Sequence, residues 1–320
     1  MKKKTSISKF VQNNLVLLAI FILVAVTIIV EPNFLTLSNF TNIMRQFGPL
    51  SFVSLGMTLV IVGGFLDMSV AGIISLVAVL IVSLIDVIGQ TGALIVGLGA
   101  GALMGFITSL LILSCGALTS AEALFITFGM SSVYGAIALI YTNAETQHMS
   151  WLKTPQTIYT AIGSGTVGFI SVSFLMFVVC LVVLFIFQKK TRPGRVIEIM
   201  GGNRIAAELA GLPVKKTVML IYTLSGLMSA IGSVVLFSRI TTASPLLGQG
   251  YETNAILSVV VGGTSLAGGK GSVLRTMLGV MLVTLLSNCM NLLGVSTYMQ
   301  TVMKGTILVI AIWLDNRKDK

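Results

Sequence analysis

The chain has 320 residues, of which 55% are hydrophobic and only 9% are charged, and its mean hydropathy is +1.01. A soluble domain typically carries about 25% charged residues, so this composition excludes soluble enzymes, disulfide-rich secreted scaffolds and disordered proteins. The net charge of +10 is compatible with a nucleic-acid partner, but a membrane protein gathers basic residues in its cytoplasmic loops. We therefore expect membrane lipid, and no nucleic acid, around this chain.

Ten apolar segments follow one another along the chain. A bilayer core about 30 Å thick is crossed by roughly 20 helical residues, so each segment is a candidate transmembrane helix. The eighth segment is short and flanked by glycines, which is typical of a broken or re-entrant helix, and the expected number of spans is therefore eight to ten. The sequence predicts an all-α polytopic membrane protein whose spans are Leu15–Val30, Pro49–Leu66, Val70–Val87, Gly92–Cys115, Ala121–Tyr141, Val167–Phe187, Thr217–Phe237, Asn254–Ala267, Gly271–Leu293 and Tyr298–Leu314.

Basic residues are unevenly distributed between the two sets of loops. If the N-terminus is cytoplasmic and the spans alternate, sixteen of the 20 Lys and Arg residues fall on the cytoplasmic side. The outer loops keep only Arg45, Lys153 and Arg239, and Lys304 falls within a span. Because short cytoplasmic loops are enriched in Lys and Arg, we predict that both termini are cytoplasmic (N-in, C-in).

Glycine positions predict how the helices pack. Gly97, Gly101 and Gly105 recur every four residues in the fourth span and so line one face of that helix. Small residues at this spacing let two helix backbones approach closely in a membrane, and we expect that contact inside one subunit rather than at a dimer interface. The tripeptide Val-Gly-Gly also ends two spans, at Val62–Gly64 and Val261–Gly263, which hints at an internal repeat of the kind found in many transporters.

No catalytic, metal or nucleotide site is recognisable in the sequence. Cys115, Cys180 and Cys289 lie in apolar runs and are expected to be buried free thiols. His148 is the single histidine, so we expect no His/Cys metal site and no cofactor. The segment Gly262–Gly271 resembles a phosphate-binding loop, but its glycines are out of the Walker A register and no hydroxyl residue follows the lysine. A tight turn between two spans is expected there.

The longest polar stretch on the predicted cytoplasmic side is Gln188–Lys216. Asn203 is suited to cap a helix N-terminus, and it precedes a short helical segment at Arg204–Leu209 that Gly211 and the following proline end. Such a helix, with small alanines exposed, has the shape of an element that docks into a groove of a partner. The residues assigned to docking are Gly201, Gly202, Asn203, Arg204, Ala206, Ala207 and Gly211.

Several motifs, mostly in the second half of the chain, resemble those of one transporter family. They are, in order, GGNRIAAELAGLPVKK, YTLSGL, GQGYETNAILSVVVGGTSLAGGKGSV, NLLGVSTYMQ and ILVIAIWLD. Ala206 and Ala207 followed by Gly211 resemble the Glu-Ala-Ala-x-x-x-Gly coupling motif of permease subunits of ATP-binding-cassette (ABC) importers, with Ile205 in place of the glutamate. Together the motifs resemble the ribose-type sugar permeases of binding-protein-dependent importers.

The resemblance implies a single transmembrane permease domain over residues 1–320, with residues 188–216 as a cytoplasmic segment that couples it to an ATPase. It implies three protein partners: a cytoplasmic ABC ATPase subunit, an extracytoplasmic sugar-binding protein and a second permease subunit, identical or paralogous. It also implies a multi-pass location in the bacterial plasma (inner) membrane. Because ATP would be hydrolysed on the separate ATPase, the chain itself is not expected to be an enzyme.

Polar residues at membrane depth are candidates for the solute pathway. Asp67 lies just before the third span, where it would cap that helix or take part in gating, and Glu122 is expected to cap the fifth span. Glu252 lies near the predicted outer mouth, where it would line the path or pair with Arg239. The candidate path residues are Asp67, Tyr251, Glu252, Thr264, Ser265, Asn288 and Asn291, of which the last four offer neutral polar groups that suit sugar hydroxyls.

Three functions are compatible with these features. The first is the permease of an ATP-driven importer that translocates a sugar or a sugar-like solute. The second is a self-sufficient ion-coupled carrier or channel for a small polar solute, which would need an acidic or histidine relay in mid-membrane, whereas the charges here cluster at span ends. The third, a non-transporting scaffold, gives no reason for the docking segment. The sequence leaves open whether the solute is a pentose, a hexose or a sugar-like signal.

Overall fold

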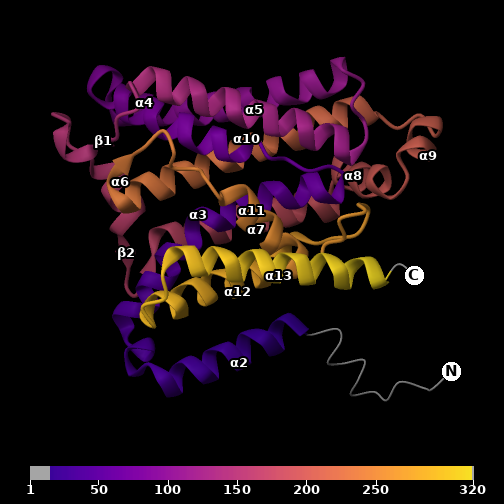
Figure 1. Ribbon diagram of the computed structural model, residues 1–320. Coiled ribbons are helices and arrows are strands. Elements are labelled where there is room, and N and C mark those ends of the chain that lie inside the picture. Colours follow the sequence, from indigo (N-terminus) through magenta and orange to yellow (C-terminus); the bar gives the residue numbers. More distant parts are fainter. Residues whose placement is uncertain (1–14, 319–320) are drawn as a thin grey trace.

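The computed structural model describes residues 15–318 and is helical almost throughout (Figure 1). The short strands form two antiparallel pairs, β1 (Gln147–His148) with β4 (Thr242–Ala243) and β2 (Thr166–Val167) with β3 (Ile170–Ser171). The helices are α2 (Leu15–Val30), η1 (Pro32–Leu35), α3 (Leu37–Val62), α4 (Val70–Ser114), α5 (Ser120–Thr142), η2 (Met149–Trp151), α6 (Thr157–Ser164), α7 (Val172–Lys190), α8 (Arg192–Gly202), α9 (Arg204–Leu209), α10 (Val214–Ile240), α11 (Tyr251–Val261), α12 (Val273–Leu292) and α13 (Thr297–Lys318).

Six helices, α3, α4, α5, α7, α10 and α12, are long and apolar enough to cross a membrane. Lipid offers no hydrogen bonds to the backbone, so an apolar chain can cross it only by bonding its own N–H and C=O groups, as a helix does. The all-α polytopic class is therefore confirmed. The finer count of ten spans stays a prediction, since α11 has only 11 residues and α2 and α13 are not among these six helices.

The helix α4 is a hairpin of two arms. It has 45 residues and would be about 68 Å long if straight, but Gly89 interrupts it with φ 75° and ψ 168°. The two arms then pack against each other, because a Cβ added at Gly97 would lie 2.2 Å from Cγ1 of Ile81. The predicted spans at Val70–Val87 and Gly92–Cys115 correspond to these two arms.

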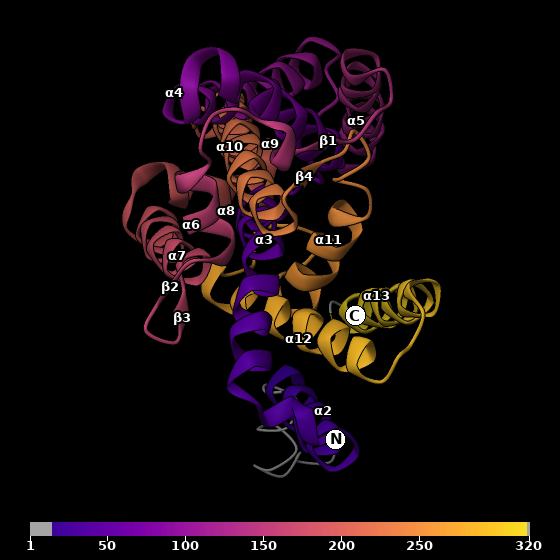
Figure 2. The ribbon, with the colours of Figure 1, turned by 90° about the vertical axis from the view of Figure 1, so that its left-hand side faces the viewer.

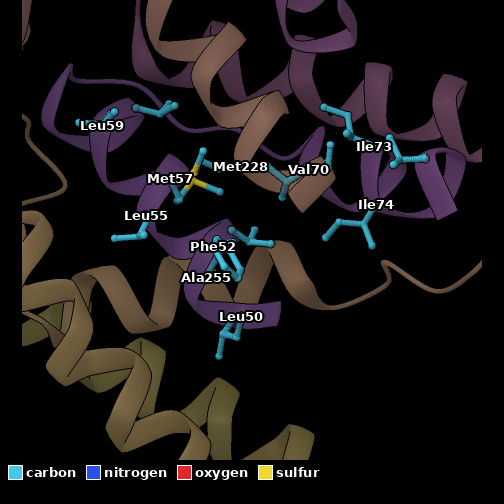
Figure 3. Packing of buried hydrophobic residues seen from close by; sticks show 14 of the residues in the cluster. Leu50, Phe52, Leu55, Met57, Leu59, Val70, Ile73, Ile74, Met228 and Ala255 are labelled. Carbon is cyan, nitrogen blue, oxygen red and sulfur yellow. The ribbon is translucent and has the colours of Figure 1, made fainter. Parts of the chain in front are cut away.

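The core of the bundle is formed by α3, α10 and the first arm of α4, with α11 and α12 packed beside α3 (Figure 2). Most side chains of α3 and α10 are buried, whereas α5 and α7 expose most of theirs. Figure 3 gives a close view of this core, in which Phe52 and Met57 of α3 lie near Met228 of α10 and Val70 of α4. The exposed apolar faces of the outer helices are the surfaces expected to contact lipid.

The helix face lined by Gly97, Gly101 and Gly105 packs inside the subunit, as expected. A Cβ on Gly105 would lie 2.2 Å from the carbonyl oxygen of Tyr222, and one on Gly226 would lie 2.3 Å from that of Gly101. These distances are shorter than any real Cβ contact, so the second arm of α4 and α10 touch backbone to backbone. The glycines thus allow a contact that a larger residue would block.

The two Val-Gly-Gly segments end their helices in the same way. Gly64, with φ 84°, donates its N–H to Ile61, and Phe65 donates to Val60, which is the hydrogen-bond pattern of a Schellman motif. Gly263, with φ 91°, and Thr264 repeat that pattern at the end of α11. The two turns are also in contact, as described below, so the suspected repeat is a local structural likeness at one end of the bundle.

The cysteines are free thiols, as predicted, but they are not all buried. Cys289 is buried and accepts a hydrogen bond from the hydroxyl of Thr27, whereas Cys115 is exposed. The prediction of burial is wrong for Cys115 because α4 ends at Ser114 and the thiol lies on the turn that follows. Glu122 forms a capping box with Thr119 at the start of α5, which confirms its predicted role.

Replacing Gly105 by Ala is expected to lower the melting temperature of the detergent-purified protein by several degrees. The added methyl group would displace Tyr222 and the α10 backbone, and overpacking of this kind costs about 1–3 kcal/mol. Gly99→Ala on the same helix is the matched control, because nothing lies within 4 Å of a Cβ there. Equal melting temperatures for the two variants would contradict the close contact between α4 and α10.

Candidate functional site

The helices α8 and α9 lie together at one end of the bundle, which also holds the C-terminal end of α13, while α6 and β1 lie at the opposite end (Figure 1). We call these the α9 end and the α6 end. The predicted short helix is confirmed with the expected bounds: Oδ1 of Asn203 accepts the Ala206 N–H at 2.9 Å. Gly211, with φ 75°, then ends it, since Gly211 and Leu212 donate to the carbonyls of Glu208 and Ala207.

The exposed surface of α9 is more apolar than expected. Ile205 and Leu209, one helical turn apart, are 66% and 84% exposed. Ala206 is exposed as predicted, but the expectation that Ala207 is exposed is wrong, because Ala207 is fully buried. It faces the protein since Leu212 folds back to bond its carbonyl. Two large apolar side chains that protrude from a capped helix form a surface that a partner can bury.

Close backbone contacts hold the residues assigned to docking against the rest of the bundle. A Cβ on Gly201 would lie 1.8 Å from the carbonyl oxygen of Val62, so α8 touches the end of α3 directly. The same carbonyl accepts the N–H of Gly269 at 2.8 Å. The guanidinium of Arg204 donates to the carbonyl of Leu118, in the loop before α5. Gly202, by contrast, is exposed and faces open space.

The side chain of Gln188 joins three elements at the α9 end. It is completely buried, and its amide donates to the carbonyl of Gly271 at 3.0 Å and accepts the N–H of Val273 at 3.1 Å, at the start of α12. It also donates to Glu198 of α8, which pairs with Lys189 at 2.6 Å. Gln188 directly precedes two lysines, so nothing in the sequence indicates that it is buried.

Asp67 lies completely buried between α3, α4 and α10. Its carboxylate accepts the N–H and hydroxyl of Ser69, at 2.9 and 2.5 Å, and the hydroxyl of Ser225 at 2.7 Å. Burial raises the pKa of this carboxyl, and the three hydrogen bonds oppose the rise. The interpretation of Asp67 as the helix cap is wrong, because the N-cap of α4 is Ser69. Asp67 instead fixes the turn before α4 and ties it to α10.

The chain enters the bundle through a series of hydrogen-bonded turns between β4 and α11. The N–H of Gly248 donates to the hydroxyl of Ser75 at 2.9 Å, and Ser75 lies only about 8 Å along α4 from its start at Val70. The helix α11 therefore begins inside the bundle and runs toward the α9 end. Glu252, in the first turn of α11, therefore lies inside the bundle, and its expected position near the outer mouth stays a prediction.

Glu252 is not paired with Arg239, so that expectation is wrong. Lys189–Glu198 is the ion pair found in the described part of the chain, and the guanidinium of Arg239 donates to Oδ1 of Asn42 at 3.5 Å. One carboxylate oxygen of Glu252 is buried without a hydrogen-bond partner among the described residues. Its position in the first turn of α11 is electrostatically favourable, because a helix N-terminus attracts negative charge.

The remaining path candidates do not come together. The buried hydroxyl of Thr264 has no partner among the described residues, and Ser265 lies in the same turn at the α9 end. Asn288 exchanges two hydrogen bonds with Asn39 of α3, at 2.9 and 3.2 Å. Asn291 accepts a hydrogen bond from Gln300 of α13 at 2.7 Å. Both amides thus join helices, and their predicted contact with a solute remains a prediction.

Comparison with known proteins identifies the chain's relatives. Residues 39–312 match the family described as the permease component of branched-chain amino acid transport systems. The chain is 37% identical to the ribose import permease protein of Bacillus subtilis, over 94% of this chain and 92% of that one. It is 31% identical to a probable ABC transporter permease protein of Escherichia coli K12, over 97% of this chain and 92% of that one. It is 32% identical to the L-arabinose transport system permease protein of the same strain, over 90% of this chain and 86% of that one. No solved structure matches.

These matches cover nearly the whole chain, and they agree with its apolar helices. They make the chain a multi-pass protein of the bacterial plasma (inner) membrane and a transport subunit rather than an enzyme. The chain belongs to the family of permease components described for branched-chain amino acid transport systems and is a membrane permease of an ABC importer.

Proposed function

We propose that this permease imports a sugar or a sugar-like solute that an extracytoplasmic binding protein delivers, and that a second permease subunit completes the pathway. We propose a sugar because the chain is 37% identical to a ribose import permease over 94% of its length. The arabinose permease relative supports it. Neutral polar groups such as Thr264, Ser265, Asn288 and Asn291 would suit hydroxyl-rich solutes, and Tyr251 and Glu252 lie where the chain re-enters the bundle.

We further propose ten membrane passes, with both termini and α9 in the cytoplasm. The hairpin of α4 would supply two passes, and α2, α11 and α13 would add the remainder to the other long helices. The common location of α9 and the end of α13 supports this topology (Figure 1). The basic residues Lys2, Lys3, Lys4 and Lys9 lie outside the described residues, so the charge argument for the N-terminus rests on the sequence alone.

The coupling step is proposed to run through α9. A cytoplasmic ABC ATPase subunit would bury Ile205 and Leu209, and its closure on ATP would push α9 toward the bundle. The movement would pass from α8 to the ends of α3 and α12, because Gly201 touches Val62 and Gln188 bonds both Glu198 and Val273. These are two-state rearrangements of packed helices of the kind that transport requires.

The substrate class is tested by uptake into proteoliposomes that contain the permease with its cognate ATPase and binding protein. We expect ATP-dependent accumulation of one sugar from a panel of radiolabelled pentoses and hexoses, and none of leucine. Leucine uptake without sugar uptake would contradict the sugar assignment. Uptake that persists without the ATPase and collapses with the proton gradient would instead support the ion-coupled carrier.

The double variant Ile205→Ser, Leu209→Ser is expected to bind the ATPase at least tenfold less tightly. Burying one such side chain contributes about 1.5–3 kcal/mol, and about 1.4 kcal/mol corresponds to tenfold in affinity. Co-purification of the ATPase with the tagged permease measures the loss. The control is Val167→Ser, Phe169→Ser, which removes two apolar side chains at the α6 end that are also more than half exposed, at 63% and 59%. Equal ATPase recovery from the two variants would rule out docking through α9.

Gln188→Leu is expected to lower the number of solute molecules transported per ATP several-fold while the ATPase still binds. The leucine would fill the space but break the hydrogen bonds that link α8 to Gly271 and Val273. Gln156→Leu serves as the control, since the amide of Gln156 donates only to Thr154, two residues away. An unchanged coupling ratio in Gln188→Leu would show that the movement does not pass through this side chain.

A further inference from the structure

A groove of about 580 Å³ lies at the α9 end, between α8 and the first turns of α10. Its floor is apolar and includes Val196, Leu212 and Leu220. Three basic side chains, Arg192, Arg195 and Lys216, line its rim and are exposed. The proposed docking surface of α9 does not include these residues, so the groove has no role in the function described above.

The charge of the groove is uncompensated by acidic residues. No Asp or Glu is among its lining residues. Glu198, the one acidic residue of α8, is held on the side of α7, where it accepts hydrogen bonds from Lys189 and Gln188. The rim therefore presents three positive charges together, which favours an anionic ligand with several acceptor oxygens.

The groove extends over two depths of the expected membrane, from the headgroup layer into the apolar layer. The helix α7 ends at Lys190 and α10 begins at Val214, so the rim lies where two membrane-crossing helices leave the apolar layer. Leu220 lies six residues further along α10, about 9 Å along its axis. The floor thus reaches the depth of acyl chains, whereas the charged ends of Arg192 and Lys216 remain at the level of the lipid headgroups.

We propose that this groove binds an anionic phospholipid, with its phosphate among Arg192, Arg195 and Lys216 and an acyl chain on the apolar floor. A water-soluble partner would reach the rim but not the floor near Leu220. Basic pockets between membrane helices on the cytoplasmic side bind anionic headgroups, and the proposed topology puts the groove on that side. The inference depends on this membrane placement and not on which solute is transported.

The test measures binding of dioleoyl-phosphatidylglycerol to the purified permease by native mass spectrometry, with dioleoyl-phosphatidylcholine as the zwitterionic reference. The wild type is expected to retain the anionic lipid preferentially. The triple variant Arg192→Gln, Arg195→Gln, Lys216→Gln should bind it roughly a hundredfold less tightly, because each basic side chain near an anionic headgroup contributes about fivefold. The control is Lys215→Gln, Lys270→Gln, Arg275→Gln, which removes the same charge from exposed sites outside the groove and should bind as the wild type does.

A second variant tests the floor without changing the charge. Ile199→Trp places a large side chain in the groove and should also weaken phosphatidylglycerol binding, with an unchanged melting temperature. Wild-type affinity in the triple variant, or equal loss in the control, would overturn the proposal. Competition by millimolar inorganic phosphate would mean a simple anion site and would overturn it too. So would loss of ATPase binding with unchanged lipid binding, because the groove would then be a protein docking surface.

Discussion

The structure depends on one constraint, the need for every backbone polar group inside a membrane to find a partner within the protein. It explains why nearly the whole described chain is helical and where the exceptions lie. The break at Gly89, the turns before α11 and the turn at Gly262–Gly271 each occur where other helices supply contacts or hydrogen bonds. Ser75, for example, accepts the N–H of Gly248 at a depth where water would be scarce.

Irregular backbone segments converge at the α9 end. There the ends of α3 and α11 finish in matching glycine turns, and Val62, Gly201 and Gly269 bring three backbones together. Side chains could not fit at this contact. If α9 docks an ATPase as proposed, this junction would pass its movement directly to the helices behind it, which is the mechanical requirement of an ATP-driven permease.

Several buried polar side chains in this protein join helices. Asp67 links the turn before α4 to Ser225 of α10, and Asn288 bonds Asn39 across α12 and α3. Buried polar groups need partners, and pairs between helices satisfy that need. The surface basic residues have a different distribution: Arg192, Arg195 and Lys216 gather around one apolar groove.

The sequence by itself determined the membrane class, the apolar helices, the short capped helix at Arg204–Leu209 and the glycine contact of α4, because hydropathy, capping residues and glycine spacing are local signals. Its motifs also indicated the transporter family. Only the tertiary structure decided that Ala207 is buried, that Asp67 binds Ser225, that Glu252 stands apart from Arg239 and that Gln188 joins α8 to α12. These facts depend on contacts between residues far apart in the chain, and no local pattern records which helix a side chain will meet.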